Sequence, residues 1–471
     1  MNEICFTPAR ELAAAIAGRR LSSVEVVTAF LDRIDEVDGR VNAITTKVPR
    51  AEALAAAEKA DKAVAAGGPL GPIHGLPIAV KDLMDVAGLR TTHGSVAYAE
   101  APLATKDSLL AERLRAGGAI FIGKTNTPEH GLGTLTYNGI FGPTCNPWNV
   151  RKNAGGSSGG AGAAVAAGML PFADGSDSGG SIRYPAAMNN LVGLRCSPGR
   201  IPSGRPGDGW SPHGVLGPIA RDAADAGLLL SALAGADPRA PLSIDDDPAQ
   251  FAAVSPTDVK GLRIAWSPAG GGLPVDPEVS RVLGATLELL ADAGAEVDEI
   301  EPTFFERADE CWEIVEMLGF VEAAGKLVDE HRSEVRRDLA RNVDQGREMS
   351  ADEIARGLAL RTDIFRATAA LLADYDVLAL PATPLVSVPA ATAFPTKIDG
   401  THLDRYFEWQ RLACRVTVTA HPSLSVPGGF AADGMPVGLQ LVGPHRGDLA
   451  LLNVAAGIEA ATGFADRHPE L

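Results

Sequence analysis

Two serines that lie within glycine-rich stretches have the surroundings that covalent catalysis needs. Ser157 belongs to a GGSSGG run at 155–160, and Ser181 follows 24 positions later in DSGGSIRYPA. Residues 155–193 hold ten glycines in 39 positions, against 52 in the whole chain of 471. Because glycine costs conformational entropy unless the backbone requires it, this concentration indicates a site with special backbone geometry.

The residues leading to Ser181 are suited to bind an oxyanion. Consecutive backbone N–H groups can point into one cavity where no side chain blocks the approach, as Gly179 and Gly180 allow. Such a nest would stabilise the tetrahedral intermediate of acyl transfer. The pattern therefore predicts a serine nucleophile at Ser181 with an oxyanion hole beside it.

The GGSSGG run admits three other interpretations. A flexible linker would not run directly into an alanine-rich helix. A phosphate loop lacks the Gly-Lys-Ser/Thr that would follow it. A nucleophile elbow of the GxSxG type needs a strand immediately before Ser157, and residues 149–154 are not expected to form one.

Alternating helices and apolar strands must position these serines. The short apolar runs at 78–80 and 119–123 are expected to be buried strands, ending at Lys81 and Lys124. Ser22 and Glu25 have the spacing of a capping box. This alternation predicts an α/β protein with a covered sheet. Further segments are expected as two helices within 11–37, helices at 51–66, 108–116, 161–168, 214–236 and 279–294, and a strand at 377–380.

Composition excludes several classes of protein. Lys plus Arg total 42 and Asp plus Glu total 59, so the formal net charge of −17 argues against direct binding to nucleic acid or to an anionic membrane. The longest mostly apolar run, 161–173, is too short to span a bilayer. Five cysteines without a CxxC pair, and an N-terminus without an apolar signal region, favour reduced thiols and a cytoplasmic location.

Taken together, these motifs resemble the amidase signature family. Besides the two serine stretches, the resemblance rests on GLPIAVKD at 75–82, GKTNTPE at 123–129, NPW at 146–148 and GMPVGLQLVG at 434–443, and it covers roughly 5–240 and 370–465. It implies an α/β fold with a large mixed sheet covered by helices on both faces. It also implies one amidase domain over 1–471, with a signature core at about 70–220 and a variable helical region at about 300–410.

The resemblance implies a Ser-cisSer-Lys triad. Ser181 would attack the carbonyl carbon, and Ser157, on a cis peptide bond, would pass protons between Ser181 and Lys81. In the same scheme the backbone N–H groups of Ser178, Gly179, Gly180 and Ser181 would hold the oxyanion. Lys81 must be neutral to accept a proton, and burial would favour that form because desolvation disfavours a charged amine. The alternative for Lys81 is an ordinary lysine that extends to solvent.

Other motif positions would support the triad. Asp177, Arg183 and Ser158 are expected to hold the loop through polar contacts, although Asp177 could equally be a local turn cap. Lys124 is expected in a structural ion pair. Ser178 departs from the threonine-like or hydrophobic residue usual in the family, but only its backbone should be needed.

The resemblance also places a wall of the substrate cleft in the segment after Asn126. Gly131, Leu132, Gly133, Thr134 and Tyr137 are expected to form a cleft wall, with Trp210 and His213 at the entrance, and ordinary packing is the alternative for the aromatic residues. A roomy apolar site would suit a small hydrophobic or aryl amide, and carbamates and esters use the same chemistry. Cys145 is expected near the cleft as a structural thiol rather than a nucleophile.

Two functions from different classes remain open. The first is a stand-alone hydrolase of a small-molecule amide, with a homodimer as an open option. The second is a glutaminase-like subunit of a complex that transamidates aminoacyl-tRNA. A Ser-His-Asp triad is the mechanistic rival. None of the nine histidines lies in an HxxxH pair, so neither metal nor cofactor is expected. A catalytically inactive binding protein conflicts with the intact set of Lys81, Ser157 and Ser181.

Overall fold

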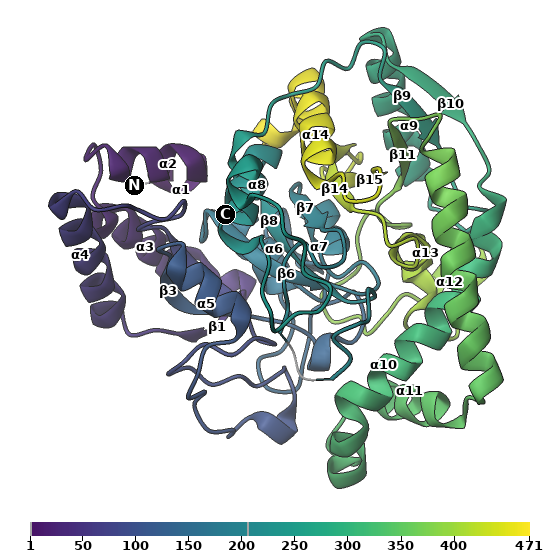
Figure 1. Ribbon diagram of the computed structural model, residues 1–471, viewed down its shortest axis with the longest axis horizontal. Helices are drawn as coiled ribbons and strands as arrows, with labels where there is room; N and C mark the ends of the chain where they lie inside the picture. Colours follow the sequence, from purple (N-terminus) through teal and green to yellow (C-terminus); the bar gives the residue numbers. More distant parts are fainter. Residues whose placement is uncertain (1, 205–206) are drawn as a thin grey trace.

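The computed structural model describes residues 2–204 and 207–471, and Figure 1 shows their arrangement. The α-helices are α1 (Asn2–Phe6), α2 (Ala9–Ala17), α3 (Ser23–Val41), α4 (Arg50–Ala66), α5 (Leu109–Ala116), α6 (Gly159–Ala166), α7 (Arg183–Met188), α8 (Ala223–Leu233), α9 (Pro277–Asp292), α10 (Ala308–His331), α11 (Arg337–Glu348), α12 (Ala351–Leu371), α13 (Arg411–Thr417) and α14 (Asp448–Thr462). The strands are β1 (Ile44–Lys47), β2 (Pro77–Lys81), β3 (Ile120–Thr125), β4 (Cys145–Asn146), β5 (Asn149–Asn153), β6 (Phe172–Asp177), β7 (Val192–Arg195), β8 (Val215–Ala220), β9 (Arg263–Trp266), β10 (Glu296–Glu299), β11 (Val377–Pro381), β12 (Lys397–Ile398), β13 (Thr401–His402), β14 (Ser423–Phe430) and β15 (Pro436–Val442).

An eight-stranded mixed sheet forms the centre of the molecule. Its strand order is β10-β9-β11-β15-β14-β7-β8-β6. β9 pairs in parallel with β10 and β11, whereas the remaining neighbours are antiparallel. The α/β class and the large mixed sheet expected from the resemblance are confirmed.

Both faces of this sheet are covered, and the alternation along its strands shows how. Val192 and Leu194 of β7 belong to the core that contains α8, α9 and α14. Gly193, between them, faces the other way, because a Cβ placed there would lie 2.6 Å from Ala186 of α7. Helices α6, α7 and α13 therefore cover the opposite face, where α10, α11 and α12 pack outside α13 (Figure 1).

A smaller three-stranded sheet, β1-β3-β2, carries the lysine motif. β2 and β3 are parallel, so the ends of the two apolar strands meet at the same edge. The sheets are joined at that edge, where the backbone N–H of Lys81 donates to the carboxylate of Asp174 on β6 over 3.1 Å.

Most local expectations are confirmed. The capping box of Ser22 and Glu25 opens α3, and the expected strands are β2, β3 and β11. Two expectations were wrong. Residues 215–220 form strand β8 rather than the start of a helix, because their buried apolar run pairs with β6 and β7. Residues 149–153 form strand β5, paired with β4 in a separate two-stranded sheet. No helix in the described ranges is long and apolar enough to cross a membrane.

Candidate active site

Lys81 lies at the end of β2 with its side chain fully buried. Its Nζ lies 2.7 Å from Ser157 Oγ, 2.8 Å from Ser158 Oγ and 3.0 Å from Ser176 Oγ. Three hydroxyl groups therefore surround the amine. This burial contradicts the alternative in which Lys81 extends to solvent.

The two serine stretches lie against each other. The peptide bond between Gly156 and Ser157 is cis. α6 begins immediately after Ser158, and the N–H of Ser158 donates to the carbonyl of Ser181 over 3.0 Å. A Cβ at Gly160 would lie 2.3 Å from the backbone nitrogen of Asn126, so glycine is required for α6 to approach the segment after β3. These contacts bring Ser157 and Ser181 to the same edge as Lys81.

Asp174 lies at this edge, and its side chain is fully buried. Desolvation raises the pKa of its carboxyl group to about 6, against the opposing effects of the Lys81 backbone N–H and of the nearby side chains of Lys81 and Lys124. Its Oδ2 atom is buried and accepts no hydrogen bond from the described residues. The sequence motifs assign no role to this residue.

In the loop 178–181, three of the four backbone N–H groups expected to form an oxyanion hole have no acceptor among the described residues. The backbone N–H groups of Ser178, Gly179 and Ser181 donate to no acceptor within the described part of the chain. The N–H of Gly180 donates instead to Asp177 Oδ1 over 2.9 Å, so it holds the loop and is not available to an oxyanion. Gly180 has φ of +106°, and a Cβ there would lie 2.7 Å from the Cβ of Ala413.

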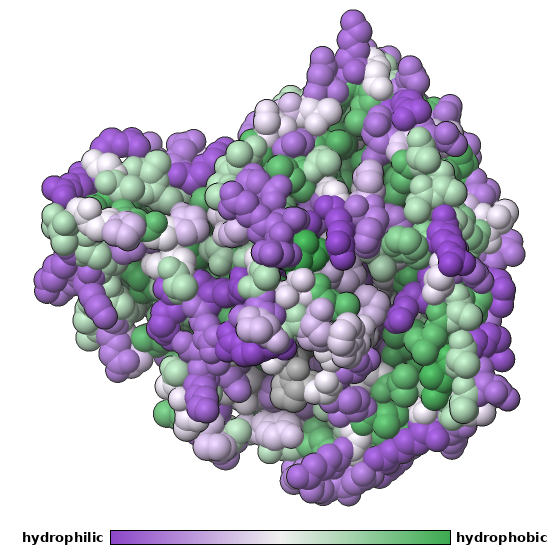
Figure 2. Space-filling model, in the orientation of Figure 1, coloured by the Kyte–Doolittle hydropathy of each residue, from purple (hydrophilic) through white to green (hydrophobic). Residues whose placement is uncertain are grey.

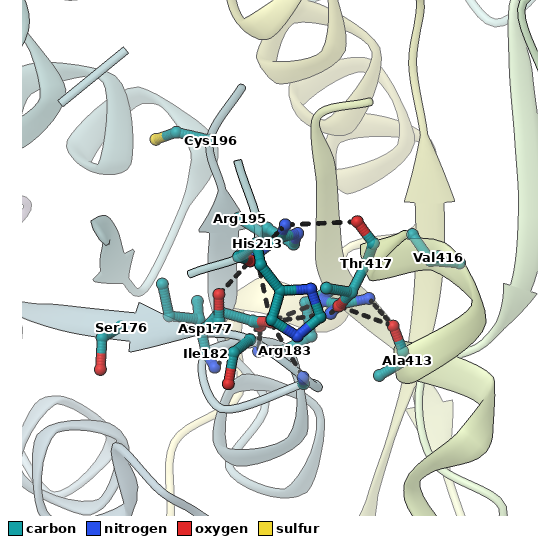
Figure 3. A network of polar contacts seen from close by, with 12 residues as sticks. Ser176, Asp177, Ile182, Arg183, Arg195, Cys196, His213, Ala413, Val416 and Thr417 are labelled. Atoms are coloured by element: carbon teal, nitrogen blue, oxygen red, sulfur yellow. Dashed lines mark hydrogen bonds and ion pairs between the residues drawn. The ribbon is translucent and has the colours of Figure 1, made fainter. Parts of the chain in front are cut away.

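Asp177 is held between two buried arginines, as Figure 3 shows. Arg183 Nη2 lies 2.8 Å from Asp177 Oδ1, and the Arg183 Nε–H donates to Oδ2 over 3.0 Å. Arg195 lies 3.7 Å away and also donates to the Asp177 carbonyl. Burial raises the pKa of Asp177, but the two guanidinium groups and the N–H of Gly180 outweigh it and hold the pKa well below its ordinary value. Asp177 therefore makes both the turn-cap contact and the arginine contacts.

Two cavities open beside the serines. The inner one has a volume of about 120 Å³, and its lining includes Ser157, Ser176, Ser178 and Ser181. The outer one has a volume of about 600 Å³ and shares Ser178 with it. Apolar side chains in the outer lining come mainly from the loops around 200 and 240 and from α10 and α12: Ile201, Pro202, Trp210, Pro241, Leu242, Val315, Leu318, Phe320 and Leu358.

The expected cleft wall lies only partly at these cavities. Gly131 lines both cavities. A Cβ added to Gly131 would lie 3.4 Å from Ser157 Oγ. The rest of the wall lines neither cavity, because it packs against the helical region. Arg336 binds the carbonyl of Leu132 and covers the ring of Tyr137. Tyr406 lies against Gly133, and Thr134 donates to Gln410.

Trp210 and His213, expected at the entrance, both line the outer cavity. Trp210 is exposed, whereas His213 is buried. Figure 2 shows hydrophobic surface over the region of α10 and α12. Leu318 of α10 and Leu358 of α12, both in the outer lining, are partly exposed.

For Lys124 and Cys145 the sequence favours a structural role, and the surroundings of both residues agree with it. Lys124 is buried, with its Nζ 3.4 Å from Asp82 Oδ1 and 2.6 Å from the carbonyl of Met84. Cys145 has a half-buried thiol whose pKa is raised by desolvation, and it lines neither cavity.

Several residues at the site carry no clear signal in the sequence. Ser176 and Asp174 lie just before the DSGGSIRYPA stretch, and their alternation along β6 with Asp177 could have suggested inward-facing side chains. Trp312 and Glu316 lie far away in the chain, on α10, and reach Ser178 only through the tertiary fold.

Comparison with known proteins identifies the family. The family model described as Amidase matches residues 25–452. The chain is 38% identical to an acylamidase of Rhodococcus erythropolis, over 98% of this chain and 96% of that protein. It is 36% identical to a glutamyl-tRNA(Gln) amidotransferase subunit of Acidothermus cellulolyticus, over 98% and 95% of the two chains. The crystal structure of a bacterial aryl acylamidase superposes with a TM-score of 0.91 at 29% identity, covering 98% of this chain and 97% of that one. The chain therefore belongs to the amidase signature family, whose members include enzymes that hydrolyse the C–N bond of amides.

Proposed function

We propose that this enzyme hydrolyses a small hydrophobic or aryl amide through an acyl-enzyme on Ser181. The single observation that carries the proposal is the 2.7 Å distance between Lys81 Nζ and Ser157 Oγ, beside a cavity that Ser157 and Ser181 both line. A buried amine next to a hydroxyl can accept a proton, and that hydroxyl can relay one from a second serine.

The proposed reaction has two halves. Ser181 Oγ attacks the carbonyl carbon while its proton passes through Ser157 to neutral Lys81. The carbonyl oxygen, now negative, lies against the free N–H groups of Ser178, Gly179 and Ser181. The C–N bond then breaks, and Ser157 returns the proton to the departing amine. Water attacks the resulting ester in the same way and releases the acid and Ser181.

We also propose positioning roles for Ser158, Asp177 and Arg183. Ser158 joins the two serine segments through its backbone and contacts Lys81 through its hydroxyl. Asp177 and Arg183 hold the nest loop. These residues position the reacting groups and do not exchange protons.

The lining of the outer cavity supports the substrate class. Apolar side chains such as Trp210, Val315 and Phe320 form a large part of this lining, and they suit an aromatic or hydrophobic group. A panel of an anilide, an aliphatic amide, a carbamate and an ester, given to the purified chain and to Ser181→Ala, tests the proposal. Turnover fastest with the anilide and absent in the variant is the expected result.

One observation favours the glutaminase alternative. Arg361 lines the outer cavity, and within the described residues it forms no ion pair. A guanidinium group is well suited to bind a substrate carboxylate. Glutamine therefore belongs in the same panel, with Arg361→Ala beside it. Glutaminase activity that appears only in a larger complex and is lost in Arg361→Ala would favour this second function.

A further inference from the structure

The orientation of the nest N–H groups depends on the carbonyl groups behind them. In a trans peptide the N–H and the C=O point in opposite directions. The N–H of Gly179 shares its peptide group with the carbonyl of Ser178, and this bond is trans. Whatever holds the Ser178 carbonyl therefore also fixes the direction of the Gly179 N–H, which points the opposite way.

Trp312 of α10 holds that carbonyl. Its indole Nε1–H donates to the carbonyl oxygen of Ser178 over 2.7 Å. The indole is buried, packs against Phe407 at 5.3 Å between ring centroids, and lies 3.1 Å from where a Cβ of Gly179 would be. The donor is thus fixed in place by packing on the side of the loop away from the cavity.

One turn further along α10, Glu316 contacts the side chain of Ser178. The Ser178 hydroxyl donates to Glu316 Oε1 over 3.2 Å, while His213 Nε2 lies 2.8 Å from the other carboxylate oxygen. Residues four apart lie on the same face of a helix. A single face of α10 therefore holds Ser178 by its carbonyl and by its hydroxyl, so this departure from the usual family residue has a partner of its own.

The other free N–H groups have donors behind them as well. Arg195 donates to the carbonyl of Asp177, whose peptide group carries the Ser178 N–H. The N–H of Tyr184 donates to the carbonyl of Gly180 over 2.8 Å, and that peptide group carries the Ser181 N–H. A donor on the carbonyl also polarises the peptide and strengthens its N–H as a donor. Only the Gly179 peptide receives this support from α10.

We propose that Trp312 is a positioning residue for the oxyanion hole: through the Ser178 carbonyl it aims and polarises the Gly179 N–H, while Glu316 holds the same residue by its hydroxyl. The inference rests on the proposed function, since it assumes that the nest receives the oxyanion. It assigns to α10, within the helical region around 300–410, a direct part in organising the site.

Trp312→Phe tests the inference, because it removes the indole donor and keeps an aromatic ring. Loss of an oxyanion donor lowers kcat by about 10²–10³-fold, so loss of a group that only orients and polarises one is expected to lower kcat by about tenfold with KM unchanged. The affinity for a trifluoromethyl ketone analogue of the best substrate, which forms an oxyanion with serine, should fall by about the same factor. Phe407→Leu is the matched control: it keeps the indole N–H and an apolar neighbour beside it, so it should lower the thermal midpoint while kcat stays within about twofold.

If Trp312→Phe does not fold, site-specific replacement of Trp312 by 3-benzothienylalanine exchanges only the N–H for sulfur. An unchanged kcat and unchanged ketone affinity in a folded variant would overturn the inference. So would equal losses of kcat in Phe407→Leu, since packing alone would then explain the effect. Ser181→Ala in the same assays distinguishes failure of the proposed function from failure of this inference. An active Ser181→Ala variant would refute the proposed function. An inactive Ser181→Ala variant beside a fully active Trp312→Phe variant would refute the inference alone.

Discussion

Asp174 and Asp177 lie three residues apart on β6, both fully buried, and the pKa values of their carboxyl groups are shifted in opposite directions. Residues three apart on a strand face opposite sides of it. Asp174 faces the backbone of Lys81, where desolvation dominates. Asp177 faces Arg183 and Arg195, whose charges dominate. One strand thus supports both the lysine and the nest.

Asp174→Asn should increase stability at neutral pH. The pKa of Asp174 is about 6 in the folded protein, against 3.8 ordinarily, so between those values the folded state binds a proton that the unfolded state has released. Stability is therefore lost as the pH rises through this window, by roughly 3 kcal/mol. Asparagine does not titrate and still accepts from the Lys81 N–H. Urea unfolding at pH 4, 5, 6 and 7 should show the variant gaining over the wild type above pH 4, and parallel pH profiles would contradict this account.

Asp177→Asn should have the opposite effect at neutral pH. Removing this carboxylate leaves Arg183 and Arg195 buried without their countercharge, which typically costs about 3–5 kcal/mol. Because the folded pKa lies below the ordinary value, the stabilisation is fully present above about pH 4 and is lost as the pH falls through the lower folded pKa. Urea unfolding at pH 7, with Asp174→Asn as the matched variant on the same strand, measures the difference. A variant as stable as the wild type would refute the role of the arginine contacts.

Lys81→Met should abolish turnover without unfolding the enzyme. Loss of the group that accepts and returns the proton is expected to lower kcat by about 10³-fold, within the range usual for general acid–base catalysis. Lys124→Met is the control, since Lys124 is equally buried at the end of the parallel strand but pairs with Asp82. It should lower the thermal midpoint while the folded fraction keeps its kcat. Comparable kcat losses in both variants would show that burial, and not proton transfer, explains the effect.

His213→Ala distinguishes the lysine mechanism from a histidine triad. Of the two histidines that line the cavities, His213 is the one paired with a carboxylate, that of Glu316. Burial lowers the pKa of the other, His130, to about 3. If His213 were the base, its loss would lower the acylation rate by at least about 10³-fold. The lysine mechanism predicts a decrease of less than about tenfold in the rate of the acylation burst.

The local pattern of the sequence predicts elements whose residues carry their own signal. Apolar runs predict β2 and β3, and the spacing of Ser22 and Glu25 predicts the start of α3. The pattern is misleading at 149–153, where a polar stretch pairs as β5, and at 215–220, where an apolar strand precedes α8. In both segments the pairing partner decides the structure, and local composition alone does not reveal that partner.

The site shows the same contrast between residues that carry a local sequence signal and residues that only the tertiary fold brings into place. Ser157 and Ser181 stand out in the sequence because the tight backbone geometry around them leaves a concentration of glycine, whereas Lys81 is singled out only through the resemblance to the amidase signature family. Tyr137 and Leu132 are assigned to the cleft wall, yet Arg336 draws both into packing with the helical region. Trp312 and Glu316 lie 134 and 138 positions from Ser178, so no local pattern connects them to it.

Mass spectrometry of the enzyme quenched during turnover of an activated anilide tests the central claim most directly. The acyl group is predicted on the peptide that contains Ser181, at a level that rises and falls with turnover, and it should be absent from Ser181→Ala. An adduct on Cys145 or on another residue, or continued turnover by Ser181→Ala, would contradict the account.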